Sequence, residues 1–279
     1  MLAELQDKVT EDQMDLSVFM EYPLKQNYVG DTLYGIPCYT DSYAICYNKA
    51  VFDKYGVEYP KEGWNWNDYE ALAEELNSKI KAEGGNEFAS ALAINEPAHG
   101  TLLLLTCNGA KLYNEDVTAC ALNVPESVEM LEMVQRMVES GAQADYDTLV
   151  ETNAASLFLS GLAGMIIICP DPGANGLFEG TSVKETLDYI AFPNGPTSGT
   201  NYIDTVTMNN IVINSGTTKF DAAWDFVKWY TTNQEALDAY AKIEWHLPTN
   251  VNAFDAWEAS HDYAEVYVEE ADKVVTVWD

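Results

Sequence analysis

Three carboxylates are the side chains of this sequence that are best placed to do chemistry. Asp41, Glu96 and Asp171 each follow a predicted strand, and open α/β sheets bind their ligands beyond the strand ends. Carboxylate oxygens accept hydrogen bonds from sugar hydroxyls, and two carboxyl groups that flank one bond could hydrolyse a glycoside. In a chain this acidic, such residues could equally face solvent. The residues alone therefore leave ligand binding, glycoside hydrolysis and a plain surface role open.

Two tyrosines flank the first of these carboxylates. Tyr39 and Tyr43 lie two positions before and after Asp41. A ring face beside a polar acceptor suits a pyranose, which has one apolar face and a rim of hydroxyls. The alternative is β-sheet packing, in which tyrosine is common. The candidate ligand-binding residues are thus Tyr39, Asp41, Tyr43, Glu96 and Asp171, and no catalytic residue is predicted.

The charge balance excludes one class of partner. The chain has 279 residues, with 14 Lys and Arg against 45 Asp and Glu, and its formal net charge is −31. Nucleic-acid binding requires a basic surface, which this composition cannot supply. A negative field favours a neutral or cationic small molecule over a phosphate.

Several cofactor and catalytic motifs are missing from the sequence. No dinucleotide-binding glycine pattern follows a strand, and the chain has neither a P-loop lysine pattern nor a nucleophile elbow. The five cysteines form no C-x-x-C pair and only three histidines are present, so no metal centre is expected. The sequence predicts no cofactor.

Apolar and polar residues alternate along the chain in patterns that predict both strands and helices. This alternation favours an α/β architecture. Asn67, with Glu70 three residues later, predicts a helix that starts with a capping box, and Trp64 and Trp66 are expected to pack at its entrance. Pro125 predicts the start of another helix. Its expected apolar stripe consists of Val128, Leu131, Val134 and Val138.

One long segment and five shorter ones resemble a known family. Residues 33–49 read LYGIPCYTDSYAICYNK, which is similar to the Y-G-I-P strand, polar segment and Y-N-K turn of the maltose-binding-like, family 1 extracellular solute-binding proteins of ABC importers. The other matching segments keep the family's order and extend the resemblance over about residues 31–250. They are Trp64–Tyr69, Asn108–Ala110, Phe158–Met165, Ala222–Lys228 and Leu247–Asn250.

The resemblance implies a fold, a function and a location. Members have a periplasmic-binding-protein type II fold, in which a hinge joins two α/β lobes and the solute binds between them. The implied protein is an extracytoplasmic, lipid-anchored binding protein that captures a sugar or oligosaccharide and delivers it to the transmembrane subunits of an ABC permease. It is not an enzyme. Asp41 and Glu96 fall where the maltose-binding branch carries sugar-contacting acids.

The sequence departs from the family at one ligand position. After the strand that ends near Ile168, the family usually has a tryptophan that stacks on the sugar. This chain has Cys169, Pro170 and Asp171 there. The resemblance therefore implies a hydroxyl-rich or partly cationic solute rather than a stacked glucan.

The ends of the chain depart from the family as well. About thirty residues precede the Y-G-I-P strand, where the family has a signal and several more elements, so we expect an incomplete N-terminal lobe. Residues 1–41 and 200–252 are expected to form that remnant, and residues 42–199 and 253–279 the C-terminal lobe. A fragment without binding activity is the alternative to a working binding protein.

Overall fold

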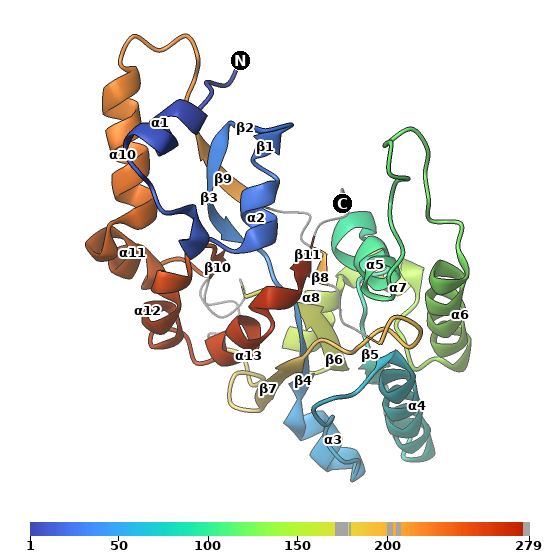
Figure 1. The fold of residues 1–279 in the computed structure, drawn as a ribbon. Coiled ribbons are helices and arrows are strands. Elements are labelled where there is room, and N and C mark those ends of the chain that lie inside the picture. The colour runs from blue at the N-terminus through green and yellow to red at the C-terminus, as the bar shows by residue number, and fades with distance from the viewer. Residues whose placement is uncertain (171–177, 179, 200–202, 205–207, 276–279) are drawn as a thin grey trace.

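The computed structural model describes residues 1–170, 178, 180–199, 203–204 and 208–275 (Figure 1). Helices pack around two separate main sheets, which confirms the predicted α/β class. None of the described helices is both long and apolar enough to span a membrane.

The larger sheet has four strands in the order β5-β6-β4-β7. Strand β5 runs parallel to β6, and β4 is antiparallel to both of its neighbours. Side chains of β4 alternate between the two faces, so Ile45 packs in one core cluster and Cys46 in another. Both faces of this sheet are therefore buried. The strands are β4 (Ala44–Asn48), β5 (Phe88–Ser90), β6 (Ala163–Ile168) and β7 (Leu187–Ala191).

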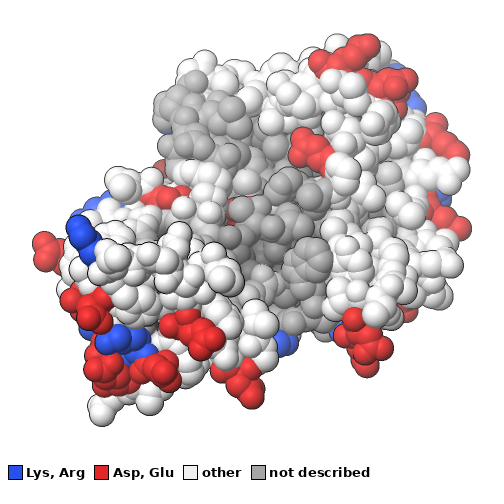
Figure 2. Space-filling model, turned by 90° about the horizontal axis from the view of Figure 1, so that it is seen from above, with Lys and Arg blue, Asp and Glu red and all other residues white. Residues whose placement is uncertain are grey.

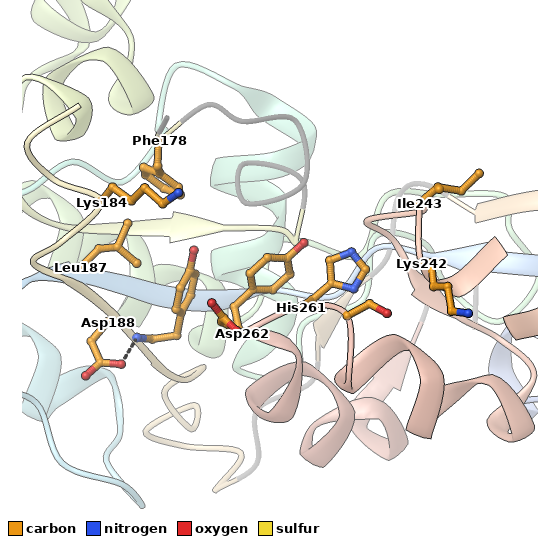
Figure 3. A pocket seen from close by; sticks show the side chains of 11 residues that line it. Phe178, Lys184, Leu187, Asp188, Lys242, Ile243, His261 and Asp262 are labelled. Atoms are coloured by element: carbon orange, nitrogen blue, oxygen red, sulfur yellow. Dashed lines mark hydrogen bonds between the residues drawn. The ribbon is translucent and has the colours of Figure 1, made fainter. Parts of the chain in front are cut away.

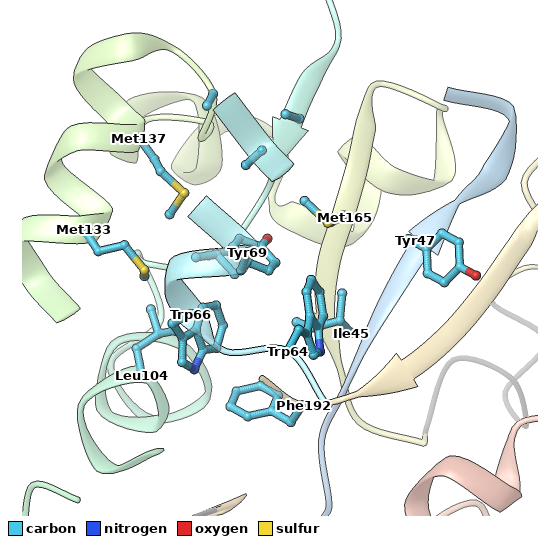
Figure 4. Packing of buried hydrophobic residues seen from close by; sticks show 14 of the residues in the cluster. Ile45, Tyr47, Trp64, Trp66, Tyr69, Leu104, Met133, Met137, Met165 and Phe192 are labelled. Carbon is cyan, nitrogen blue, oxygen red and sulfur yellow. The ribbon is translucent and has the colours of Figure 1, made fainter. Parts of the chain in front are cut away.

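An aromatic and methionine core covers one face of the larger sheet. Trp66 and Tyr69 are fully buried there, and Met133 and Met137 face them from the neighbouring helix (Figure 4). The two tryptophans at the helix entrance thus pack in the core, as expected. Helices α3 (Lys49–Tyr55), α4 (Trp66–Ala82), α5 (Leu103–Cys107) and α6 (Pro125–Ser140) contribute to this face, and α7 (Tyr146–Thr152) and α8 (Ala154–Leu159) to the other.

Two local predictions about these helices were wrong. The N-cap of α4 is Asn65, not Asn67, and its capping box is completed by Asp68. The difference arises because Asn65 and Asn67 are both good caps, and burial of Trp66 selects the earlier one. In α6 the buried stripe consists of methionines, whereas Val128 and Leu131 are about half exposed. Both stripes have helical spacing, and the longer, adaptable methionines fill the space beneath the helix.

The smaller sheet has three antiparallel strands in the order β10-β3-β9. Leu33 and Ile36 are fully buried against Trp224, whose indole N–H donates to Asp12 over 2.7 Å. The strands are β3 (Gly35–Thr40), β9 (Met208–Val212) and β10 (Leu247–Pro248), and the helices around them are α1 (Gln6–Glu11), α2 (Glu21–Lys25), α10 (Phe220–Thr232) and α11 (Gln234–Ala241).

A third core joins the two sheets. It contains Ala44 of the larger sheet, Leu247 of the smaller one, and Trp257 and Tyr267 of the C-terminal helices. The hydroxyl of Tyr267 also donates to the carbonyl of Ile168 over 3.1 Å. The helices are α12 (Phe254–Glu258) and α13 (Ala264–Glu269), which lie between the lobes in Figure 1.

Short elements complete the described chain. Strands β1 (Tyr28–Val29) and β2 (Thr32–Leu33) form a hairpin, and β8 (Ile203–Asp204) pairs in parallel with β11 (Val274–Val275). A π-helix, Pro97–Leu102, precedes α5, and 3₁₀ turns lie at Leu16–Val18, Val251–Ala253 and Ala271–Lys273. The predicted lobe boundaries at residues 41, 199 and 252 stay a prediction.

A partly buried ion pair links α3 to Glu87, which directly precedes β5. The Glu87 carboxylate accepts hydrogen bonds from Lys54 over 2.5 Å and from the Tyr55 hydroxyl over 2.7 Å. Burial alone would raise the pKa of Glu87, but these hydrogen bonds lower it to about 2. Because an unfolded Glu has a pKa of about 4.3, ionised Glu87 contributes stability above that pH, and this contribution disappears as the pH falls toward 2.

We expect Glu87→Gln to lower the free energy of unfolding by about 1 kcal/mol at neutral pH, since the Glu87 side chain is 10% exposed and only partly screened. Urea titrations at several pH values measure this difference, which should shrink between about pH 4 and about pH 2. Glu83→Gln, at an exposed position four residues earlier, is the matched control. A Glu87→Gln deficit that does not change with pH would contradict the assigned pKa.

Candidate functional site

The two sheets meet where β3 gives way to β4. Strand β3 ends at Thr40 and β4 begins at Ala44, which pairs with Ile168 at the end of β6 and with Ala191 at the end of β7. Residues 41–43, together with Cys169 after β6 and Phe192 after β7, therefore lie at one edge of the larger sheet. This edge faces the smaller sheet, and open α/β sheets place their ligands at such an edge.

Asp41 lies in this connection and is only 5% exposed. One of its carboxylate oxygens, Oδ1, lies 3.5 Å from Nε2 of His246. The other ring nitrogen of His246, Nδ1, is hydrogen-bonded to the Glu244 carboxylate. The Tyr39 ring stacks on the His246 ring at a centroid distance of 4.6 Å and on the Tyr240 ring at 5.5 Å. We call Tyr39, Asp41, Tyr240, Glu244 and His246 the crossing cluster.

The electrostatics of the crossing cluster are set by its two carboxylates and its histidine. Burial would raise the pKa of Glu244, yet hydrogen bonds from the His246 ring and backbone hold it below its ordinary value. Burial raises the pKa values of Tyr39 and Tyr240, and the negative charge of Glu244 raises both further. Glu244 is therefore an ionised acceptor and both tyrosines are neutral hydroxyls, so the cluster offers hydrogen-bonding groups and ring faces together.

No metal site is found in the described part of the chain, where no group of three or more His, Cys, Asp or Glu side chains has a metal-binding arrangement. In the crossing cluster, the His246 ring nitrogens are directed at carboxylate oxygens of Asp41 and Glu244. Hydrogen bonding and charge hold this cluster together.

Hydrogen bonds of one buried glutamine hold the loop that carries Glu96 in place. The Gln143 side chain accepts hydrogen bonds from the Leu92 N–H and the Ser90 hydroxyl, and it donates to the Leu92 carbonyl over 3.0 Å. Gly100 lies so close to the loop that a Cβ there would be 1.9 Å from the Ala93 carbonyl oxygen. Glu96 itself is exposed at the start of the π-helix, an element that is frequent at functional sites.

Of the two remaining candidate ligand-binding residues, one is buried and the other lies outside the described residues. Tyr43 is 3% exposed and packs in the core of the larger lobe, as the sheet-packing alternative predicts for this residue. Asp171 lies outside the described residues. The structure therefore brings Tyr39 and Asp41 together in one cluster, and it places Glu96 on a separate, exposed loop.

A cavity of about 710 Å³ opens between the end of α11, strand β7 and the segment between α12 and α13. Lys242 and Ile243, at the end of α11, line one side, while Phe178, Lys184 and Leu187 line the other (Figure 3). Sites for small ligands commonly have volumes of about 300–1,000 Å³, so this cavity is large enough for an oligosaccharide unit. The remaining lining residues are Asp188, Tyr189, Ser260, His261, Asp262 and Tyr263.

The cavity and the crossing cluster adjoin each other along the chain. Ile243, which is 80% exposed, directly precedes Glu244 of the cluster. Sequence reasoning missed Glu244 and His246, although they form the E-W-H run immediately before the L-P-T turn. Because the sequence has only three histidines, that run was the feature that could have pointed to Glu244 and His246 as site residues.

Comparison with known proteins places the chain among binding proteins. A family model described as bacterial extracellular solute-binding protein matches residues 1–237. A binding protein of Brucella abortus is 28% identical over 262 residues, covering 91% of this chain and 58% of that protein. The maltotriose-binding protein of Pyrococcus abyssi is 25% identical over 236 residues, covering 82% of this chain and 47% of that protein. The chain thus spans about half the length of these curated relatives.

Solved structures share its fold. An ABC substrate-binding protein of Listeria monocytogenes in complex with cycloalternan has a TM-score of 0.80 at 23% identity, covering 99% of this chain and 69% of that one. The GacH receptor of Streptomyces glaucescens, solved unliganded and with acarbose, has a TM-score of 0.76 at 20% identity, with coverages of 99% and 68%. The predicted periplasmic-binding-protein type II fold is confirmed.

We expect Gln143→Met to lower the free energy of unfolding by about 1–3 kcal/mol, because the buried Leu92 N–H would lose its acceptor and the Leu92 carbonyl one of its two donors. Denaturant titration measures the loss. Gln135→Met on α6 is the matched control, since the Gln135 side chain bonds only to exposed Glu139. Equal stability of the two variants would show that the Gln143 hydrogen bonds do not hold the loop.

Proposed function

The chain belongs to the bacterial extracellular solute-binding protein family, and from this we propose that it captures a sugar or oligosaccharide between its two lobes and delivers it to the transmembrane subunits of an ABC permease. The whole protein is proposed to work outside the cytoplasm, where this family is found, and to be lipid-anchored at the cell surface. The lobes would comprise residues 1–41 with 200–252 and residues 42–199 with 253–279.

One observation carries the proposal: Lys242 and Ile243, which line a cavity, are followed directly in the chain by Glu244 and His246 of a cluster of ring faces and carboxylates. Aromatic faces stack on the apolar side of a pyranose, and carboxylates accept hydrogen bonds from its hydroxyls. Closure of two lobes around a solute would bring these groups onto it from both sides. The names of the relatives support a carbohydrate, since they include a maltotriose-binding protein and proteins solved with cycloalternan and acarbose.

The net charge of the chain restricts the class of solute that we propose. On the face in Figure 2, acidic side chains are scattered over the surface with few basic ones among them, as the net charge of −31 requires. A partly cationic solute would be attracted by this field, a hydroxyl-rich neutral one would not be repelled, and an anionic one would be repelled. Tyr39, Asp41, Tyr43, Glu96 and Asp171 remain the proposed ligand contacts, with Tyr43 the least accessible of those that are described.

Glycoside hydrolysis is the weaker alternative. A working carboxylate pair must flank one bond across a separation of about 5–10 Å. Asp41 is paired with His246 in the crossing cluster, whereas Glu96 lies on a separate, exposed loop, so these two carboxylates are not arranged as a catalytic pair. We propose a binding role without catalysis, and incubation with maltotriose should release no smaller sugars.

We expect maltotriose, acarbose or cycloalternan to raise the melting temperature of the protein, because a ligand present at 100 times its Kd stabilises the folded state by about 2.7 kcal/mol. Calorimetry should then show affinities reduced by roughly tenfold or more for Tyr39→Ala and Asp41→Asn. Tyr146→Ala and Asp147→Asn, at exposed positions on α7, are the matched controls.

Two results would count against the proposal. If glycerophosphocholine, the ligand of a structural neighbour from Mycobacterium tuberculosis, binds and no sugar does, the carbohydrate class is wrong. If the Tyr39 and Asp41 variants bind a sugar as tightly as the controls do, the site lies elsewhere.

A further inference from the structure

His246 has carboxylate oxygens at both of its ring nitrogens. Nε2 lies 3.5 Å from Asp41, and Nδ1 is hydrogen-bonded to Glu244. A neutral imidazole carries one ring proton, so one nitrogen would present its lone pair to a carboxylate. An imidazolium donates from both nitrogens and pairs with both acids. The geometry therefore favours the charged form of His246.

The surroundings of His246 favour the same form. The side chains of His246 and Asp41 are 12% and 7% exposed, so water screens their attraction poorly. The Tyr39 ring lies 4.6 Å from the imidazole with an interplanar angle of 30°, and the Trp245 ring stacks on the imidazole as well. Aromatic faces attract cations. His246 thus lies between two carboxylates and two ring faces.

Glu244 is anchored independently of the histidine ring. Its carboxylate accepts hydrogen bonds from the backbone N–H groups of Trp245 and His246 over 3.2 and 3.3 Å. The indole of Trp257 donates to the Glu244 carbonyl over 2.9 Å. A fixed Glu244 fixes the imidazole, and the imidazole in turn limits the orientations that the Asp41 carboxylate can take. These contacts form a chain from the loop after α11 to the connection between the lobes.

We propose that His246 is a positioning residue of the inter-lobe site: held by Glu244, its imidazolium orients the Asp41 carboxylate, so that solute affinity depends on the charge of His246. This inference rests on the proposed function, because it takes Asp41 to be a solute contact. The titratable groups that face His246 are Asp41 from the connection, Glu244 from its own loop, and Tyr39 from β3, with Tyr240 of α11 stacked behind Tyr39.

The proposal predicts the direction in which solute affinity changes with pH. Loss of the proton from His246 removes the positive charge that attracts the Asp41 carboxylate across 3.5 Å, so the orienting contact weakens as the pH rises. Affinity should therefore fall as the pH rises and His246 loses its charge.

The first test needs no solute. NMR of protein labelled with ¹⁵N-histidine reports the protonation of each ring nitrogen, and His246→Gln assigns the His246 signals. We expect both nitrogens of His246 to carry protons at pH 7 in the wild type, and Glu244→Gln to weaken that state. Glu235→Gln, at an exposed position on the preceding helix, should leave it unchanged. A neutral His246 tautomer at pH 7 would overturn the proposal and leave the proposed function untouched.

The second test asks whether His246 acts through Asp41. Calorimetry with maltotriose compares wild type, His246→Phe, Asp41→Asn and the double variant, because Phe keeps a ring beside Tyr39 but donates no hydrogen bond. Each single change should weaken binding roughly tenfold or more, and the double variant should bind no more weakly than Asp41→Asn. His246→Phe should also lose the pH dependence. If the His246→Phe variant is unstable, His246→Gln takes its place in this experiment.

Additive effects of the two substitutions, or wild-type affinity of the His246 variants, would overturn the proposal. If the wild-type protein binds no maltotriose, the proposed function fails for this sugar, and the NMR result alone decides the charge of His246. The two failures are therefore distinguishable.

Discussion

The connection between β3 and β4 is the constraint on which the rest of the site depends. Asp41, Ser42 and Tyr43 link the two sheets and all three are buried. An ionised carboxylate in such a place is stable only when it is paired, and His246 supplies that partner from the loop directly before β10, the strand beside β3. Pairing draws the loop after α11, the smaller sheet and the connection into one unit. The third core, which contains Ala44, Leu247 and Trp257, encloses this unit with apolar packing. A polar pair inside an apolar connection is thus what places solute-binding groups between the lobes.

The parts of the fold that depend on local patterns could be predicted from the sequence. Gly56 and Gly141 end their helices in the left-handed conformation, as glycine after a helix usually does. Local patterns failed where two solutions were equally good, as for Asn65 against Asn67 and for the two stripes of α6. The site divides in the same way. Tyr39 and Asp41 follow from a strand end, whereas their contacts with His246 join positions about two hundred residues apart, and no spacing within one segment predicts such a contact.

Composition and geometry together define the kind of solute that the site suits. The chain is strongly acidic as a whole, yet its buried crossing cluster is arranged so that each charge has a partner. Binding there depends on oriented hydrogen bonds and ring faces rather than on net attraction. The family membership and the shared fold agree with this type of site. Because the chain spans about half the length of the curated relatives, the activity of the whole protein is a proposal built on this site.

Hydrogen–deuterium exchange with and without maltotriose tests the central claim most directly. If a sugar binds between the lobes, backbone amides of residues 39–43 and 242–246, which lie on the two sides of the crossing cluster, should exchange more slowly together, and those of residues 92–96 should follow. Exchange in α7, outside the cavity lining, should stay unchanged. Sugar binding that protects neither 39–43 nor 242–246 would contradict a site between the lobes.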